Sequence, residues 1–291
     1  MPVTFGELST LTTPLSVARL CALFFSCLTF SLASSMDYDF KSPEHTYHST
    51  FYSFCMVIWC LFFVLTFLIV VIHFIQFHNL LPLSWKNLTA TVAALGALMA
   101  FTASFAFTWT LVGNSENSDP RTIAAAVGSC LTSLAYFIEL QLIRSQSDGH
   151  QRGYMATVPG LLKLLQVFGG CIALVLLSIQ SEPKWRTCVS AVTYSMCLLP
   201  SVVTVLVMLM DCAARSPVPF DRLLASFSLL GLIMYTVGTV VCFTRALEQQ
   251  GGAQKQGAVV IIISETVMAC ITLLAYTVDL AFSVKLLCDR N

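Results

Sequence analysis

Five charged residues stand inside long apolar stretches of this sequence: Arg19, Glu139, Lys163, Glu265 and Asp279. A charged group in such a stretch is costly, so it usually faces a partner or a hydrated cavity. These residue types allow two kinds of chemistry. A base and an acid can form an ion pair that fastens two helices, or a carboxylate can relay protons or ions.

Other chemistry finds little support in the sequence. Only one apolar stretch carries histidine, at His73 and His78, whereas a haem or di-iron site needs ligands from facing elements. The twelve cysteines form no CxxC or Cys/His ligand spacing, and most lie in apolar runs, where cysteine acts as a small hydrophobe. GxSxG and GxxxxGK[ST] motifs are also absent. We therefore expect a protein that is not an enzyme and holds no cofactor and no metal.

The composition indicates the class of protein to which these apolar stretches belong. Hydrophobic residues make up 57% of the 291 residues, charged residues make up 10%, and the net charge is zero. Soluble domains average about 25% charged residues. A nucleic-acid binder needs a basic surface, and a disordered chain needs low hydrophobicity. The sequence therefore predicts an all-α integral membrane protein.

Eight stretches are long enough to cross a bilayer, which takes about 20 mostly apolar residues. They are Leu15–Ser34, Phe54–Phe77, Leu88–Val112, Thr122–Arg144, Val158–Ile179, Cys188–Met210, Leu223–Thr244 and Ala258–Leu287. The connections are too short for a soluble domain and carry most of the charge. Pro200 is expected to kink the sixth helix.

Basic residues in short loops set the orientation of such a chain. With a cytoplasmic N-terminus, nine basic residues lie inside and six outside, which favours both termini in the cytoplasm. The sequon that begins at Asn87 then lies on the cytoplasmic side and should be unused. Cys212 and Cys288 lie at the same membrane edge, and both are candidates for palmitoylation or remain free thiols.

An internal repeat relates the two halves of the chain. Thr132–Leu140 and Thr272–Leu280 share the pattern Thr-x-Leu-Ala-Tyr-x-x-acid-Leu at an offset of 140 residues. Leu95-Gly96 matches Leu230-Gly231 at an offset of 135, and Arg19 matches Lys163 at an offset of 144. Each half contains four spans, an even number, so the two halves have the same orientation in the membrane.

The repeat also organises the charges. Arg19 and Glu139 lie at similar depths, as do Lys163 and Asp279, so we hypothesise one ion pair in each half between its first and last helix. Tyr136 and Tyr276 lie one turn from the acids and could add hydrogen bonds. Either basic side chain could instead snorkel to the interface. Glu265 has no counterpart, and a neutral hydrogen-bonded carboxyl and a proton relay both remain open.

Three segments carry a family resemblance. The stretch from Gly153 to Lys163, and Pro82-Leu83-Ser84-Trp85-Lys86-Asn87, resemble the myeloid-associated differentiation marker family, and so does Leu273–Leu280. The resemblance covers nearly the whole chain, although the N-terminus is shorter than the family pattern. It implies two tandem four-helix MARVEL domains, at residues 11–148 and 153–289.

The resemblance further implies a multi-pass plasma-membrane protein that organises ordered, cholesterol-rich, raft-like membrane. Its implied partners are membrane lipids and membrane or cortical proteins, with no nucleic acid. The residues leave two alternatives open: a small-solute or ion transporter that uses Glu265, and an assembly or trafficking subunit for another membrane protein.

Overall fold

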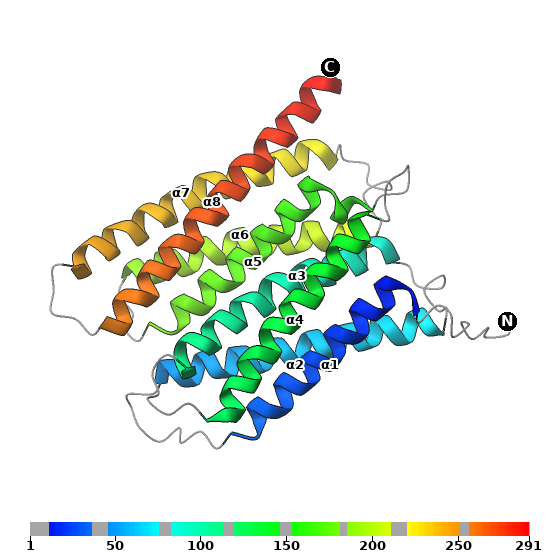
Figure 1. The fold of residues 1–291 in the computed structure, drawn as a ribbon. Helices are drawn as coiled ribbons and strands as arrows, with labels where there is room; N and C mark the ends of the chain where they lie inside the picture. The colour runs from blue at the N-terminus through cyan, green and yellow to red at the C-terminus, as the bar shows by residue number, and fades with distance from the viewer. Residues whose placement is uncertain are drawn as a thin grey trace. The chain divides into compact units, whose positions relative to one another are not determined.

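The computed structural model describes residues 12–36, 46–75, 83–112, 119–145, 153–180, 185–210, 220–250 and 256–290, and these contain no strand. The helices are α1 (Pro14–Ser34), α2 (Thr46–Phe74), α3 (Trp85–Phe107), α4 (Pro120–Ser145), α5 (Val158–Ser178), α6 (Trp185–Leu209), α7 (Phe220–Gln250) and α8 (Gln256–Arg290) (Figure 1). A π-helical turn, η4 (Thr108–Val112), follows α3, and a 3-10 turn, η5 (Tyr154–Ala156), precedes α5.

Eight of these helices are long and apolar enough to cross a membrane. This confirms the predicted all-α fold of an integral multi-pass membrane protein. Several helices run past the predicted ends, two of them by six residues or more: α2 begins at Thr46 and not Phe54, and α7 ends at Gln250 and not Thr244. The apolar pattern marks only the part of a helix that suits lipid, so it misses polar turns that continue beyond it.

Local signals explain where α1 and α5 begin. Thr13 caps α1 by accepting a hydrogen bond from the Ser16 backbone N–H at 3.3 Å, and Pro14 lies in the first turn. Pro159 has the corresponding place in α5, after Thr157 at the cap position. Proline suits a first turn because its missing N–H would have no helical acceptor there.

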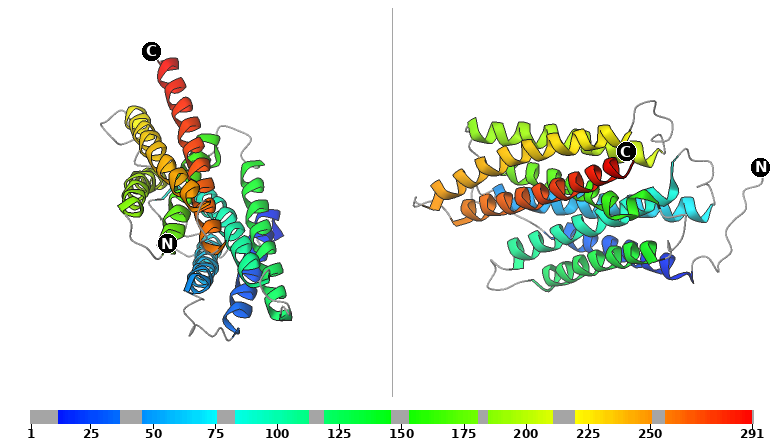
Figure 2. Two further views of the ribbon diagram at one scale, coloured as in Figure 1. Left: turned by 90° about the vertical axis from the view of Figure 1, so that its left-hand side faces the viewer. Right: turned by 90° about the horizontal axis from the view of Figure 1, so that it is seen from above.

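The chain divides into two compact units, Met1–Ala156 and Thr157–Asn291. In the first unit α1 and α3 each pack against both α2 and α4, so the four helices form a ring. Figure 2 shows these helices, coloured blue to green, running alongside one another. The second unit has the same order of neighbours, with α5 and α7 each packed against α6 and α8.

Small residues bring the helices close together, and large apolar residues point outward. Ala22, Ala93 and Ala103 are fully buried, whereas Phe24 and Phe101 are more than 60% exposed. Such a surface would aggregate in water, but lipid solvates it well. Burial of large apolar residues therefore does not drive the helices together, and small residues provide the close contacts between them.

Candidate functional site: buried polar clusters in the two units

The charged residues that stood out in the apolar stretches lie in the interiors of the two units. In the first unit Arg19 on α1 donates from Nε to Glu139 Oε1 on α4 at 2.7 Å. The two side chains are 4% and 3% exposed. The structure therefore brings together the base and the acid that the repeat placed at one depth, and neither side chain snorkels to the surface.

The second unit contains the matching pair with more hydrogen bonds around it. Lys163 Nζ on α5 donates to Asp279 Oδ2 on α8 at 2.5 Å. Gln166 Nε2 donates to the same oxygen at 3.1 Å, and the Ser228 hydroxyl on α7 donates to it as well. By the repeat offsets, alanines occupy the places of Gln166 and Ser228 in the first unit, at Ala22 and Ala93.

The proposed hydrogen bonds from tyrosine to these acids are wrong. The hydroxyl of Tyr136 bonds to the Thr66 hydroxyl at 2.8 Å and donates to the Phe62 carbonyl oxygen at 3.1 Å, both on α2. One turn along a helix places two side chains near each other, but the long tyrosine ring carries its hydroxyl across to the neighbouring helix.

Tyr276 makes the equivalent contacts in the second unit. Its hydroxyl bonds to the Ser201 hydroxyl at 2.8 Å and donates to the Cys197 carbonyl oxygen at 3.3 Å, both on α6. These partners follow Thr66 and Phe62 by 135 residues, so the contact extends the repeat to α2 and α6. Gly231 on α7 leaves room for the ring, because a Cβ there would overlap Tyr276.

Glu265 on α8 is fully buried and is held by four side chains. Its Oε1 accepts from the Tyr194 hydroxyl and the Cys242 thiol, each at 3.2 Å, and its Oε2 accepts from Gln180 Nε2 at 2.6 Å. Arg245 Nη1 lies 3.4 Å from both carboxylate oxygens. The sequence left open a neutral hydrogen-bonded carboxyl and a proton relay and named no basic partner, so the contact with Arg245 is new.

Arg245 was predicted to lie in a loop because the apolar stretch ends at Thr244. In the structure it lies on α7, which continues to Gln250. The residues that follow it, Ala246 to Gln250, are strong helix formers, and this signal was present in the sequence.

The Glu265 cluster has no charged equivalent among the described residues of the first unit. By the repeat offsets, Trp59, Phe107 and Ala125 stand where the second unit has Tyr194, Cys242 and Glu265. The rings of Trp59 and Phe107 pack edge to face, with centroids 5.3 Å apart. Trp59 Nε1 also donates to the Ser129 hydroxyl at 3.1 Å, so the first unit has aromatic packing and neutral hydrogen bonds where the second unit has a carboxylate and its donors.

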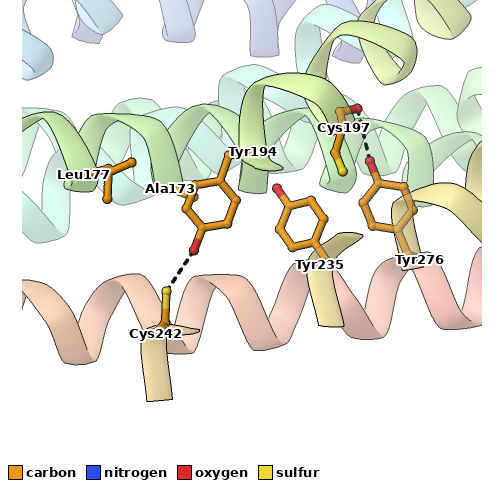
Figure 3. Packing of buried hydrophobic residues seen from close by; sticks show 7 residues of the cluster. All are labelled: Ala173, Leu177, Tyr194, Cys197, Tyr235, Cys242 and Tyr276. Carbon is orange, nitrogen blue, oxygen red and sulfur yellow. Dashed lines mark hydrogen bonds between the residues drawn. The ribbon is translucent and has the colours of Figure 1, made fainter. Parts of the chain in front are cut away.

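A row of three tyrosines lies between the two polar clusters of the second unit. Figure 3 shows Tyr194, Tyr235 and Tyr276 side by side, with Tyr194 reaching Cys242 and Tyr276 reaching Cys197. Neighbouring ring centroids are 5.5 Å and 5.3 Å apart. The three rings are almost fully buried and pack with Ala173 and Leu177.

The remaining predicted positions are placed as follows. Asn87 is buried in the first turn of α3, and its Oδ1 accepts from the Met155 backbone N–H at 3.2 Å. Cys288 is exposed on the last turns of α8, and Cys212 lies outside the described residues. Over the parts of the chain that the structure describes, no three His, Cys, Asp or Glu residues gather as metal ligands do.

The arrangement favours fastening over catalysis. Each buried charge has an oppositely charged neighbour, and Asp279 and Glu265 also accept hydrogen bonds from further donors, which is how a protein stabilises charge in a low-dielectric interior. Within the described residues two of these contacts join the first helix of a unit to its last, α1 to α4 and α5 to α8, and the third joins the consecutive helices α7 and α8.

Relatives among known proteins cover nearly the whole chain. It is 30% identical to the myeloid-associated differentiation marker homolog of Xenopus laevis, over 97% of this chain and 95% of the relative. It is 31% identical to the myeloid-associated differentiation marker of Rattus norvegicus, over 97% and 93%. It is also 31% identical to the myeloid-associated differentiation marker-like protein 2 of Homo sapiens, over 96% and 94%. No family model and no solved structure matches the chain.

Proposed function

The chain belongs to the myeloid-associated differentiation marker family, and from that premise we propose that it is a non-enzymatic organiser of ordered, raft-like membrane. In this role it gathers lipids and membrane or cortical proteins without transforming them. We place it in the plasma membrane with both termini in the cytoplasm, and we assign a MARVEL domain to residues 11–148 and another to 153–289.

The observation that carries this proposal is the contrast between the interior and the outer surface of each unit. The charged side chains inside form ion pairs between helices, so their role is to join those helices. The outward faces carry large apolar side chains, for example Phe101, Phe105 and Leu274, each at least 64% exposed. Contact with lipid and with other spans is then the main interaction that these surfaces support.

The lengths of the spans indicate the kind of bilayer. The shortest candidate spans, Pro14–Ser34 and Val158–Ser178, have 21 residues, and Ser49–Phe74 has 26. At about 1.5 Å per residue these correspond to about 32 Å and 39 Å. Such spans suit the plasma membrane, whose hydrocarbon core is about 32–33 Å thick, better than a thinner bilayer.

The test is partitioning in giant vesicles that contain coexisting ordered and disordered phases. We expect the purified protein to concentrate in the thicker, ordered phase. The control uses lipids whose two phases have equal thickness, where the preference should disappear because length matching no longer distinguishes the phases. Equal partitioning in the first vesicles, together with no partner recovered from cells by co-purification, would reject the proposal.

A second candidate function, transport of a small solute or an ion, is favoured by one observation. Glu265 and its donors form a polar cluster that the first unit replaces with Trp59, Phe107 and Ala125. A flux assay in proteoliposomes separates the two functions. Transport predicts a flux that Glu265→Gln abolishes and that Glu248→Gln, a change at a 64% exposed side chain, leaves intact.

A further inference from the structure

A small cavity that is not fully enclosed lies in the second unit, next to the Lys163–Asp279 pair. Its polar lining comes from Lys163, Gln166, Ser201, Thr204 and Tyr276. Pro200, Met196, Phe227 and Leu230 form much of the remaining wall. The space open to the centre of a water molecule is about 10 Å³, close to the minimum that holds one water.

One acceptor at this cavity lacks a protein partner. Gln166 is 1% exposed, and its Nε2 donates to Asp279 Oδ2. A carboxylate can only accept, so this contact fixes the orientation of the amide and turns Oε1 away from Asp279. Oε1 is buried and has no hydrogen-bond partner among the described residues. An unpaired buried oxygen of this kind is destabilising, so a hydrogen-bond donor is expected near it.

Two further groups at the cavity have hydrogen-bonding capacity to spare. The Lys163 ammonium has three N–H donors and donates to Ser228 and Asp279, which leaves one N–H. Pro200 lies inside α6 and has no N–H, so it cannot donate the helical hydrogen bond to the Met196 carbonyl. The cavity therefore brings together a spare donor and two spare acceptors.

From these groups we propose that the cavity is a binding site for a single ordered water molecule. The water accepts a hydrogen bond from Lys163 and donates to Gln166 Oε1 and to the Met196 carbonyl. Three hydrogen bonds are typical of a buried structural water. The water thus completes the hydrogen bonding of the charged pair and supports the proline in α6.

The site is a property of the second unit alone. By the repeat offsets, the positions of Pro200 and Gln166 correspond to Leu65 and Ala22 in the first unit. Leu65 has an N–H for its helix, and Ala22 has no side-chain acceptor.

Hydroxyl-radical labelling tests the proposal on the intact protein in detergent. Ionising radiation turns a trapped water into a radical that oxidises the nearest side chains, and mass spectrometry reads the products. Tyr276 lines the cavity, and Tyr136 is the matched control because it is equally buried and makes the same kinds of hydrogen bonds. We expect Tyr276 to be oxidised severalfold faster than Tyr136, and equal rates would overturn the proposal.

Two variants then assign the labelling to this site. Pro200→Leu introduces the residue of the matching place in α2 and restores the N–H, and Gln166→Leu removes the spare acceptor. Each should reduce the excess oxidation of Tyr276 and leave Tyr136 unchanged, which also reports that the protein is folded. An excess that persists in both variants, or a lipid that native mass spectrometry finds bound and that Pro200→Leu releases, would contradict a water site.

Discussion

Replacing Arg19 with Met should strongly destabilise the first unit. The change leaves the Glu139 carboxylate, which is 3% exposed, without its basic partner in the interior. Breaking a buried ion pair in this way costs about 3–5 kcal/mol, mostly because the remaining charge stays buried. Removing both charges together, with Arg19→Met and Glu139→Met, should cost less than either single change.

The exposed pair between Arg186 and Glu248 is the matched control. Its Nη1–Oε2 distance is 2.6 Å, against 2.7 Å for the buried pair, but its side chains are 29% and 64% exposed. Exposed pairs contribute about 0–1 kcal/mol, so Arg186→Met should have little effect. Burial, and not distance, then accounts for the difference between the two changes.

The measurement is unfolding in mixed micelles of increasing sodium dodecyl sulfate content, followed by tryptophan fluorescence. Three of the four tryptophans, Trp59, Trp85 and Trp109, belong to the first unit, so the signal reports mainly on the region that changes. The reasoning is refuted if Arg19→Met shifts the midpoint no further than Arg186→Met does. It is also refuted if the double variant loses the sum of the two single losses.

Three further predictions concern packing, glycosylation and the Glu265 cluster. Gly231→Ala should destabilise the second unit by about 1–3 kcal/mol because its Cβ overlaps the Tyr276 ring. Gly238→Ala, whose nearest neighbour would be 3.2 Å away, should be close to neutral when unfolding in the same micelles is followed by circular dichroism, which reports on both units. Asn87 should carry no glycan in cells, since its side chain is buried and occupied, and a mobility shift after glycosidase treatment would disprove this. Tyr194→Phe should destabilise by about 1–3 kcal/mol by removing a donor to buried Glu265, and an unchanged midpoint would mean that the remaining donors are sufficient.

The spans and the ion pairs illustrate what a sequence of this kind reveals. Eight long apolar stretches predict eight helices because lipid offers no partner for an unpaired backbone group. Arg19 and Glu139 could be matched because the repeat gives both halves the same pattern, and depth in a membrane depends only on position along a span. Neither inference needs the identity of the neighbouring helices.

The contacts of Tyr136 and Arg245 show where such reasoning ends. Tyr136 lies one turn from Glu139, yet its hydroxyl bonds to Thr66 and Phe62 on α2, because the long side chain carries the hydroxyl to the neighbouring helix. Arg245 was assigned to a loop because hydropathy ends before the helix does, so its contact with Glu265 was missed. Which side chains meet across a bundle depends on helix rotation and ring length, and a single sequence reports neither.

The two ion pairs also set an order for building the protein during synthesis. Arg19 enters the membrane 120 residues before Glu139, and Lys163 enters 116 residues before Asp279. At about 5–20 residues per second, roughly ten seconds pass before each base can meet its acid. Each half can therefore form its ion pair only when its fourth helix has entered the membrane. A chain that stops one helix short leaves an unpaired positive charge in the lipid, which distinguishes it from a complete chain.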